Sequence, residues 1–147
     1  MPRKLMCLDY IMAKEIMALA VKSAKSHGAP GAIAIVDQAG HLMLLERLDG
    51  TMHAASNIAI GKAATAVAFQ RPTKEIEDVI IKGRSPMLML DNATSQAYIP
   101  LKGGHPILYN SEIIGGIAVA GTMDAELDET IVLEALKYKK SINNEDI

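Results

Sequence analysis

The chain has 147 residues, half of them hydrophobic, and a formal net charge of -2 at neutral pH. This length and apolar content suit one domain with a buried core, so we expect a single domain over residues 1–147. The charge balance provides no basic surface of the kind that nucleic acid or acidic lipid requires, and neither is an expected partner.

Cysteine content and the N-terminal segment bear on the compartment. Cys7 is the only cysteine of the sequence, which excludes a disulfide framework and a thiolate metal cluster. The first apolar run ends at Asp9, too early for a signal peptide, and no apolar run approaches the ~20 residues of a membrane helix. We therefore expect a protein of the reducing cytoplasm with no membrane partner.

The first third of the chain predicts a helix followed by a β-hairpin. Asp9 is placed to cap a helix that runs to about Ser26, because apolar residues recur there at helical spacing before a glycine. Residues 32–37 and 42–48 are short apolar runs on either side of a Gln-Ala-Gly turn, which is typical of a hairpin.

The middle of the chain predicts two helices and a long connection. Residues 51–70 carry alanines every three or four positions, which favours a helix that can approach a neighbouring sheet closely. Gly61 lies inside this helix, and close packing on the sheet would offset its cost. A shorter amphipathic helix is expected over 74–82, and residues 83–102 show no sustained period.

The last third predicts a second hairpin, over residues 105–109 and 112–120, and a final helix from Asp124 that ends before a polar tail, SINNEDI. Asp124 and Asp128 are interpreted as capping and charging the first turn of that helix. Both hairpins are expected to share one sheet. The second strand of the second hairpin places bulky side chains on one face and small ones on the other: Ile113, Ile117 and Val119 against Gly116, Ala118 and Ala120.

Two histidines are the candidate metal ligands. His53 opens the alanine-rich helix and His105 follows two glycines, so either imidazole could project into a cleft, and imidazole is a standard axial ligand of haem iron. A structural or solvated histidine is the competing interpretation at each position. Phosphate-loop, dinucleotide, nucleophile-elbow and zincin motifs do not occur in the sequence.

Basic side chains near glycines complete the candidate ligand site. Arg47 lies on an apolar strand face, where it could hold a carboxylate or propionate or pair with Asp49. Lys62 could extend from a packed helix or point into the same cleft. The glycines that would edge the cleft are Gly103, Gly104 and Gly121.

Four stretches resemble the GlcG/HbpS family, whose members include the C-terminal domain of PduO and the OrfY proteins. They are AIAIVDQAGHLMLLERLDG, GKAATAVAFQRPT, GGHPI and IIGGIAVAG, the last followed by Asp128-Glu129, and the likeness covers about Leu8 to Leu136. The resemblance implies a profilin-like α/β sandwich with a central antiparallel sheet of about five strands and helices packed on it. It also implies homo-oligomers and, in some members, haem binding with slow haem degradation.

Three functions follow as hypotheses. The first is an accessory protein that binds haem or a related tetrapyrrole such as a corrinoid, with His53 or His105 as iron ligand. The second is an accessory protein or enzyme of glycolate, glycerol or propanediol utilisation, in which Arg47 holds the carboxylate of a small molecule. The third is a purely structural homo-oligomer.

The apolar content also predicts self-association. A small sheet flanked by few helices leaves apolar surface to be covered, and monomers rarely expose large apolar patches. Residues 87–90, Met-Leu-Met-Leu, run together without helical or strand alternation and are the expected boundary between subunits. We expect a symmetric homo-oligomer with the ligand cleft near that boundary.

Overall fold

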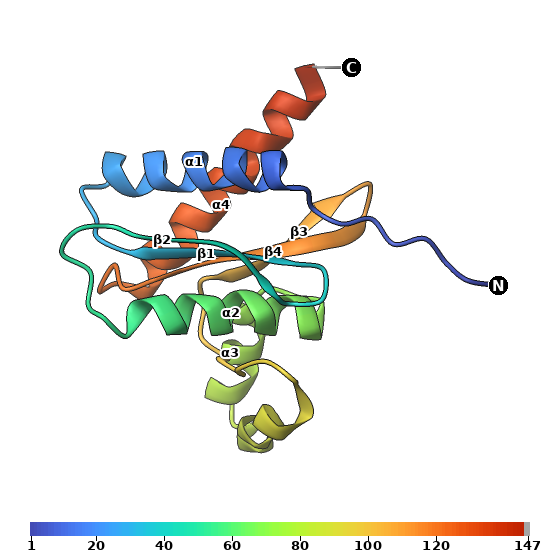
Figure 1. Ribbon diagram of the computed structural model, residues 1–147. Helices are drawn as coiled ribbons and strands as arrows, with labels where there is room; N and C mark the ends of the chain where they lie inside the picture. Colours follow the sequence, from blue (N-terminus) through green and yellow to red (C-terminus); the bar gives the residue numbers. More distant parts are fainter. Residues whose placement is uncertain (146–147) are drawn as a thin grey trace.

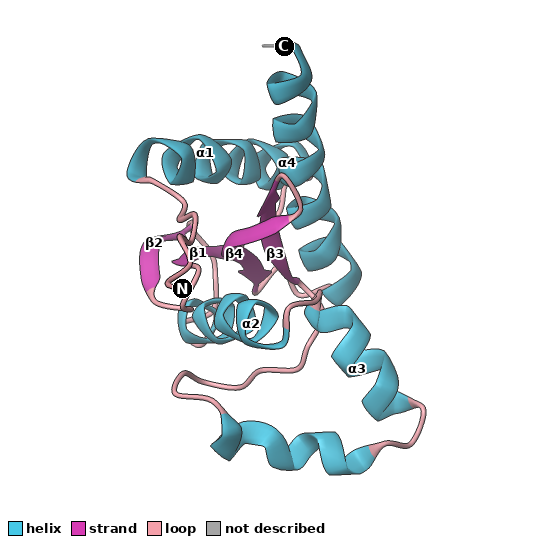
Figure 2. Ribbon diagram, turned by 90° about the vertical axis from the view of Figure 1, so that its right-hand side faces the viewer, coloured by secondary structure: helices cyan, strands magenta, loops and turns pink. Residues whose placement is uncertain are grey.

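The computed structural model describes residues 1–145, which form a sheet with helices on both faces (Figures 1 and 2). Along the chain the elements are α1 (Tyr10–Ser26), β1 (Ala32–Asp37), β2 (Leu42–Arg47), α2 (Ala55–Phe69), α3 (Thr73–Ile81), the 3-10 helix η1 (Ser85–Ala93), β3 (Gly104–Tyr109), β4 (Glu112–Ala120) and α4 (Ala125–Glu145).

The sheet is antiparallel, with strand order β2-β1-β4-β3. Because β1 pairs with β4, the two hairpins share one sheet, as predicted. The prediction of about five strands was wrong: the sheet has four. The sequence holds only four runs with strand character, and the long segment before β3 forms the helix η1 instead of a further strand.

α1 and α4 cover one face of the sheet, and α2 covers the other (Figure 2). Asp9 caps α1 as predicted, since its Oδ1 atom accepts a hydrogen bond from the Met12 N–H at 2.8 Å. Between α1, α4 and the sheet lies the larger part of the core, which includes Ile16, Ile33 and Ile117. The bulky face of the strands is therefore buried against the apolar stripes of α1 and α4.

α2 packs on the face of the sheet that carries small side chains, as its alanines predicted. Ala55 and Ala59 contact alanines of β1 and β4. At Gly116 an added Cβ would lie 2.7 Å from Val67 Cγ2 and 2.9 Å from the Ala63 oxygen. The helix and the strand can therefore approach this closely only because residue 116 has no side chain.

A β-bulge changes the predicted faces of β4. Ile107 pairs with Gly115 and Leu108 pairs with Ile113, so Ile114 is an extra residue between them. Beyond the bulge the alternation is reversed: Ile114 joins the core under α1 and α4, while Ile113 packs on the side of α2. The prediction that Ile113 shares a face with Ile117 was therefore wrong.

Three further predictions need correction. Residues 83–102 are not a plain connection, because Ser85–Ala93 form the helix η1. Gly61 does not face the sheet: an added Cβ there would collide with Ile99 Cγ1, in the segment that follows η1. α4 continues to Glu145, through most of the predicted polar tail, and the rest of that tail, Asp146 and Ile147, lies outside the described residues.

No helix within residues 1–145 is both long and apolar enough to span a bilayer.

Candidate functional site

The predicted site residues separate into two groups. Arg47, His53 and Gly121 line one hollow at the end of the sheet where β2 ends and β4 leads into α4. Lys62, Gly103, Gly104 and His105 belong instead to polar contacts between α2, β3 and α4. The single cleft predicted from the sequence is thus divided between two places.

The hollow around Gly121 has a volume of about 740 Å³ and is formed by the loop from β2 to α2 and the turn after β4. We call it the Gly121 hollow. Besides the Arg47 guanidinium, the Asp49 carboxylate and the His53 imidazole, its lining includes two thioethers, from Met52 and Met123. The last two are 44% and 80% exposed, and Arg47 and His53 are exposed as well, so all four side chains are accessible to a ligand.

Thr51 fixes the loop that carries His53. Its buried hydroxyl oxygen accepts a hydrogen bond from the Gly31 N–H at 2.8 Å, and its hydroxyl donates to the Leu48 carbonyl at 2.6 Å. Gly121 forms the floor at φ 84°, where an added Cβ would lie 2.6 Å from Ala55 Cβ. The start of α2 and the turn after β4 are therefore held in close contact.

Arg47 does not form the ion pair with Asp49 that was the competing interpretation of its charge. Among the described side chains none is ion-paired with the Arg47 guanidinium. The five N–H donors of Arg47 therefore remain free to bind an anionic group of a ligand.

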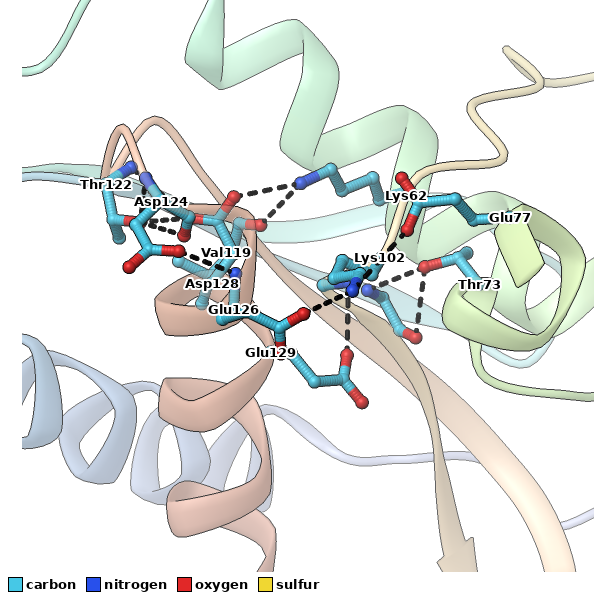
Figure 3. A network of polar contacts seen from close by, with 12 residues as sticks. Lys62, Thr73, Glu77, Lys102, Val119, Thr122, Asp124, Glu126, Asp128 and Glu129 are labelled. Carbon is cyan, nitrogen blue, oxygen red and sulfur yellow. Dashed lines mark hydrogen bonds and ion pairs between the residues drawn. The ribbon is translucent and has the colours of Figure 1, made fainter. Parts of the chain in front are cut away.

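Lys62 forms a buried ion pair. It is 3% exposed, and its Nζ donates hydrogen bonds to the Val119 carbonyl at 3.0 Å and to Asp128 Oδ2 at 3.3 Å. The other oxygen of Asp128 accepts from the Thr122 N–H at 3.2 Å and from the Thr122 hydroxyl at 2.6 Å (Figure 3). Lys62 therefore joins α2 to β4 and α4 and is not open to a ligand.

Glu129 connects Gly103 to His105. Its carboxylate accepts a hydrogen bond from the Gly103 N–H at 3.1 Å and lies 2.9 Å from His105 Nε2. The Gly104 N–H donates to the Thr73 hydroxyl oxygen at 2.9 Å. The glycine amides and one nitrogen of the His105 ring are thus used within the protein, which favours a structural role for this network.

Sequence reasoning missed Glu129 and assigned Asp128 only to the helix terminus. Both residues are buried: Asp128 is 6% exposed and Glu129 is 7% exposed. A signal was present, because Asp128 precedes Ile131 and Val132 by three and four positions and so lies on the same face of α4 as these buried residues. Acidic residues on an apolar stripe predict buried partners of opposite charge or N–H donors.

The Glu129 carboxylate predicts a pH dependence of stability. Burial raises the pKa of Glu129, but the hydrogen bond and charge of His105, the Gly103 N–H and the charge of Lys74 together hold it below the usual 4.5. A depressed folded-state pKa stabilises the protein above the unfolded-state value, and this contribution is lost as pH falls through the folded-state pKa.

We therefore expect Glu129→Gln to cost about 1–3 kcal/mol of unfolding free energy at pH 6, where Glu129 is ionised. The difference between wild type and variant should shrink as pH is lowered from 4.5 to 3. Urea unfolding at each pH measures it, and a difference that stays constant down to pH 3 would contradict the assignment.

Comparison with known proteins agrees with this fold. The family model described as "haem degrading protein HbpS-like" matches residues 8–137. The chain belongs to the HbpS-like family. Protein GlcG of Escherichia coli K12 is 33% identical over 113 residues, which cover 77% of this chain and 81% of GlcG. The resemblance predicted from the sequence motifs is confirmed.

Two solved structures place the HbpS-like chain among its structural neighbours. The ORFY protein of Klebsiella pneumoniae superposes with a TM-score of 0.84 at 25% identity and covers 92% of each chain. The PduOC:heme complex superposes with a TM-score of 0.80 at 26% identity, covering 89% of this chain and 94% of that one.

Proposed function

We propose that this protein binds haem, or a related tetrapyrrole, in the Gly121 hollow. The proposal is supported by the lining of this hollow, in which His53, Arg47 and two methionines lie beside Gly121. His53 would supply an axial ligand to the iron, and Arg47 would pair with a propionate. Bound haem would supply a redox-active iron.

The donor set of the hollow fits this class of ligand. Among the side chains that the structure describes, in residues 1–137, no group of three or more His, Cys, Asp or Glu is placed to hold a metal ion. Haem iron needs only one or two axial ligands from the protein, because the porphyrin provides the others. The exposed thioethers of Met52 and Met123 provide soft, polarizable contact surface in a chain with only 3% aromatic residues.

The relatives support the same class of ligand. The family model carries haem degradation in its description, and a structural neighbour was solved as a complex with haem. The competing proposal is a small carboxylate held by Arg47 in the same hollow, as in the hydroxy-acid hypothesis. The two differ in what should raise the melting temperature: hemin in the first case, glycolate in the second.

Hemin titration of the purified protein tests the proposal, with the Soret band as readout. We expect a shifted Soret band that saturates near one hemin per chain. Arg47→Gln should weaken binding about tenfold, since a charge-assisted hydrogen bond is lost. Arg84→Gln, which removes an exposed arginine outside the hollow, is the matched control. Absence of any Soret shift at stoichiometric hemin would contradict the proposal.

We also infer that the protein forms a homo-oligomer through η1 and the end of α3. Ile81, Leu88 and Met89 are 74%, 56% and 76% exposed, and they lie on elements that contact each other. Large apolar side chains exposed together favour a protein interface.

Met89→Asp should dissociate the assembly while each subunit stays folded, because a carboxylate cannot be buried in an apolar interface without a partner. Asn57→Asp adds the same charge at an exposed polar position of α2, away from η1, and should leave the assembly intact. Light scattering at micromolar concentration measures both. A monomeric native chain would refute the interface.

A further inference from the structure

A second hollow lies at the opposite end of the sheet from the Gly121 hollow. It has a volume of about 470 Å³ and is lined by the N-terminal segment, the turns of both hairpins and the C-terminal end of α2. Figure 1 shows these four segments gathered at one end of the molecule, where β1 leads into β2 and β3 into β4. We call it the hairpin-end hollow, and none of the residues discussed for haem lines it.

Two cations lie at the rim of the hairpin-end hollow. Arg3 and Lys4 line it together with Glu112, which leaves a net positive charge. Neither cation is paired with a carboxylate in the described part of the chain. Leu8 anchors the segment that carries them: it is 3% exposed, and its N–H donates to the Ile114 carbonyl at 3.0 Å. Arg3 and Lys4 are exposed residues of this segment that line the hollow, where they favour an anion.

The Gln38 side chain supplies an unsatisfied polar atom at the same place. Its Oε1 atom is buried and accepts no hydrogen bond from any described residue, although Gln38 lines the hollow. A buried polar atom without a partner destabilises the fold, so its presence calls for an explanation. A hydroxyl group of a ligand would satisfy the amide, because a hydroxyl can both donate and accept. Rotation about the last side-chain bond of Gln38 would turn the amide toward such a group.

Ser111 adds a hydroxyl at an energetic cost. It follows Asn110 in the β3–β4 turn, and both have positive φ, 48° at Asn110 and 66° at Ser111. Turns of this kind favour Asn-Gly, because glycine adopts the second position without strain. Ser111 lines the hollow, and its hydroxyl forms no hydrogen bond with the described residues. A strained residue that keeps a free hydroxyl at a cavity points to a binding role for that hydroxyl.

We propose that the hairpin-end hollow binds a small hydroxylated phosphate monoester, such as a sugar phosphate. Arg3 and Lys4 contact the phosphate, while Gln38 and Ser111 hydrogen-bond the hydroxyls. The proposal does not depend on haem binding, because the two hollows share no lining residue and lie at opposite ends of β1.

Isothermal titration of the full chain with glucose 6-phosphate tests the proposal. Glucose lacks the phosphate, and inorganic phosphate lacks the sugar hydroxyls. Titrated separately, each should therefore bind at least tenfold more weakly than glucose 6-phosphate. Arg3→Ala combined with Lys4→Ala should abolish binding. The matched control, Lys82→Ala with Arg84→Ala, removes the same charge from exposed positions outside the hollow and should leave binding unchanged.

Two further variants separate ligand binding from folding. Gln38→Leu removes the unsatisfied amide, and Ser111→Gly relieves the positive φ, so neither should lower the melting temperature of the unliganded protein. Each should weaken glucose 6-phosphate binding at least tenfold. The proposal is overturned if glucose 6-phosphate does not bind at millimolar concentration, binds no better than inorganic phosphate, or binds both variants as tightly as wild type.

Discussion

Lys62→Met is expected to destabilise the protein by about 3–5 kcal/mol, because it leaves the Asp128 carboxylate buried without its cation. Asp128 is 6% exposed, so water cannot replace the lost Lys62 Nζ. Methionine keeps most of the volume of the lysine chain, so the loss reports on the charge and not on a cavity. Urea unfolding followed by circular dichroism measures the effect.

A double variant isolates the charge. In the native protein the Thr122 N–H lies 3.2 Å from Asp128 Oδ1. Asp128→Asn removes the carboxylate but keeps an oxygen that can accept this hydrogen bond. Lys62→Met combined with Asp128→Asn should therefore recover much of the lost stability, since no unpaired charge is left. A Lys62→Met cost below about 1 kcal/mol, or a double variant no more stable than Lys62→Met alone, would contradict the buried pair.

Gly104→Ala is expected to cost about 3 kcal/mol, at the upper end of what overpacking usually costs. An added Cβ would lie 2.5 Å from the Lys62 carbonyl oxygen and 2.9 Å from the carbon bonded to it. These are backbone atoms of α2, so relief requires β3 to move away from the helix. The strain would also disturb the hydrogen bond between the Gly104 N–H and Thr73.

Gly28→Ala is the matched control for this substitution. Gly28 has φ 63°, but an added Cβ there meets nothing within 4 Å. The control should therefore lose only about 1 kcal/mol of unfolding free energy, which is the cost of alanine at a positive φ. Thermal and urea denaturation of both variants test the comparison. Equal losses would show that the close approach of α2 to β3 is not what requires glycine at position 104.

The hairpins and the packing of α2 could be predicted from the sequence, because both follow from local patterns. Side-chain alternation identifies strands, and an alanine stripe opposite a strand face of small residues indicates close contact. The bulge at Ile114 could not be predicted in this way, since its position depends on the pairing of β3 with β4. One extra residue then moved Ile113 to the opposite face.

The candidate site was harder to predict because its residues are distant in the sequence. His53 and His105 both follow turns, and nothing local indicates that one lines an open hollow while the other contacts Glu129. Likewise, nothing local in the sequence indicates that the Lys62 ammonium is bound by Asp128 of α4 and not open to a ligand. Long-range pairing of charges depends on sheet register and helix packing, which short sequence motifs do not report.

We propose that haem binds at the Gly121 hollow through His53. Hemin titration of two matched variants, His53→Gln and His105→Gln, tests it most directly. Glutamine lacks an imidazole ligand but can still donate a hydrogen bond to Glu129, so the fold at position 105 should be preserved. We predict that His53→Gln loses the Soret shift of the native complex, whereas His105→Gln retains it at near-native affinity. An unchanged Soret shift in His53→Gln, or its loss in a folded His105→Gln, would contradict the account.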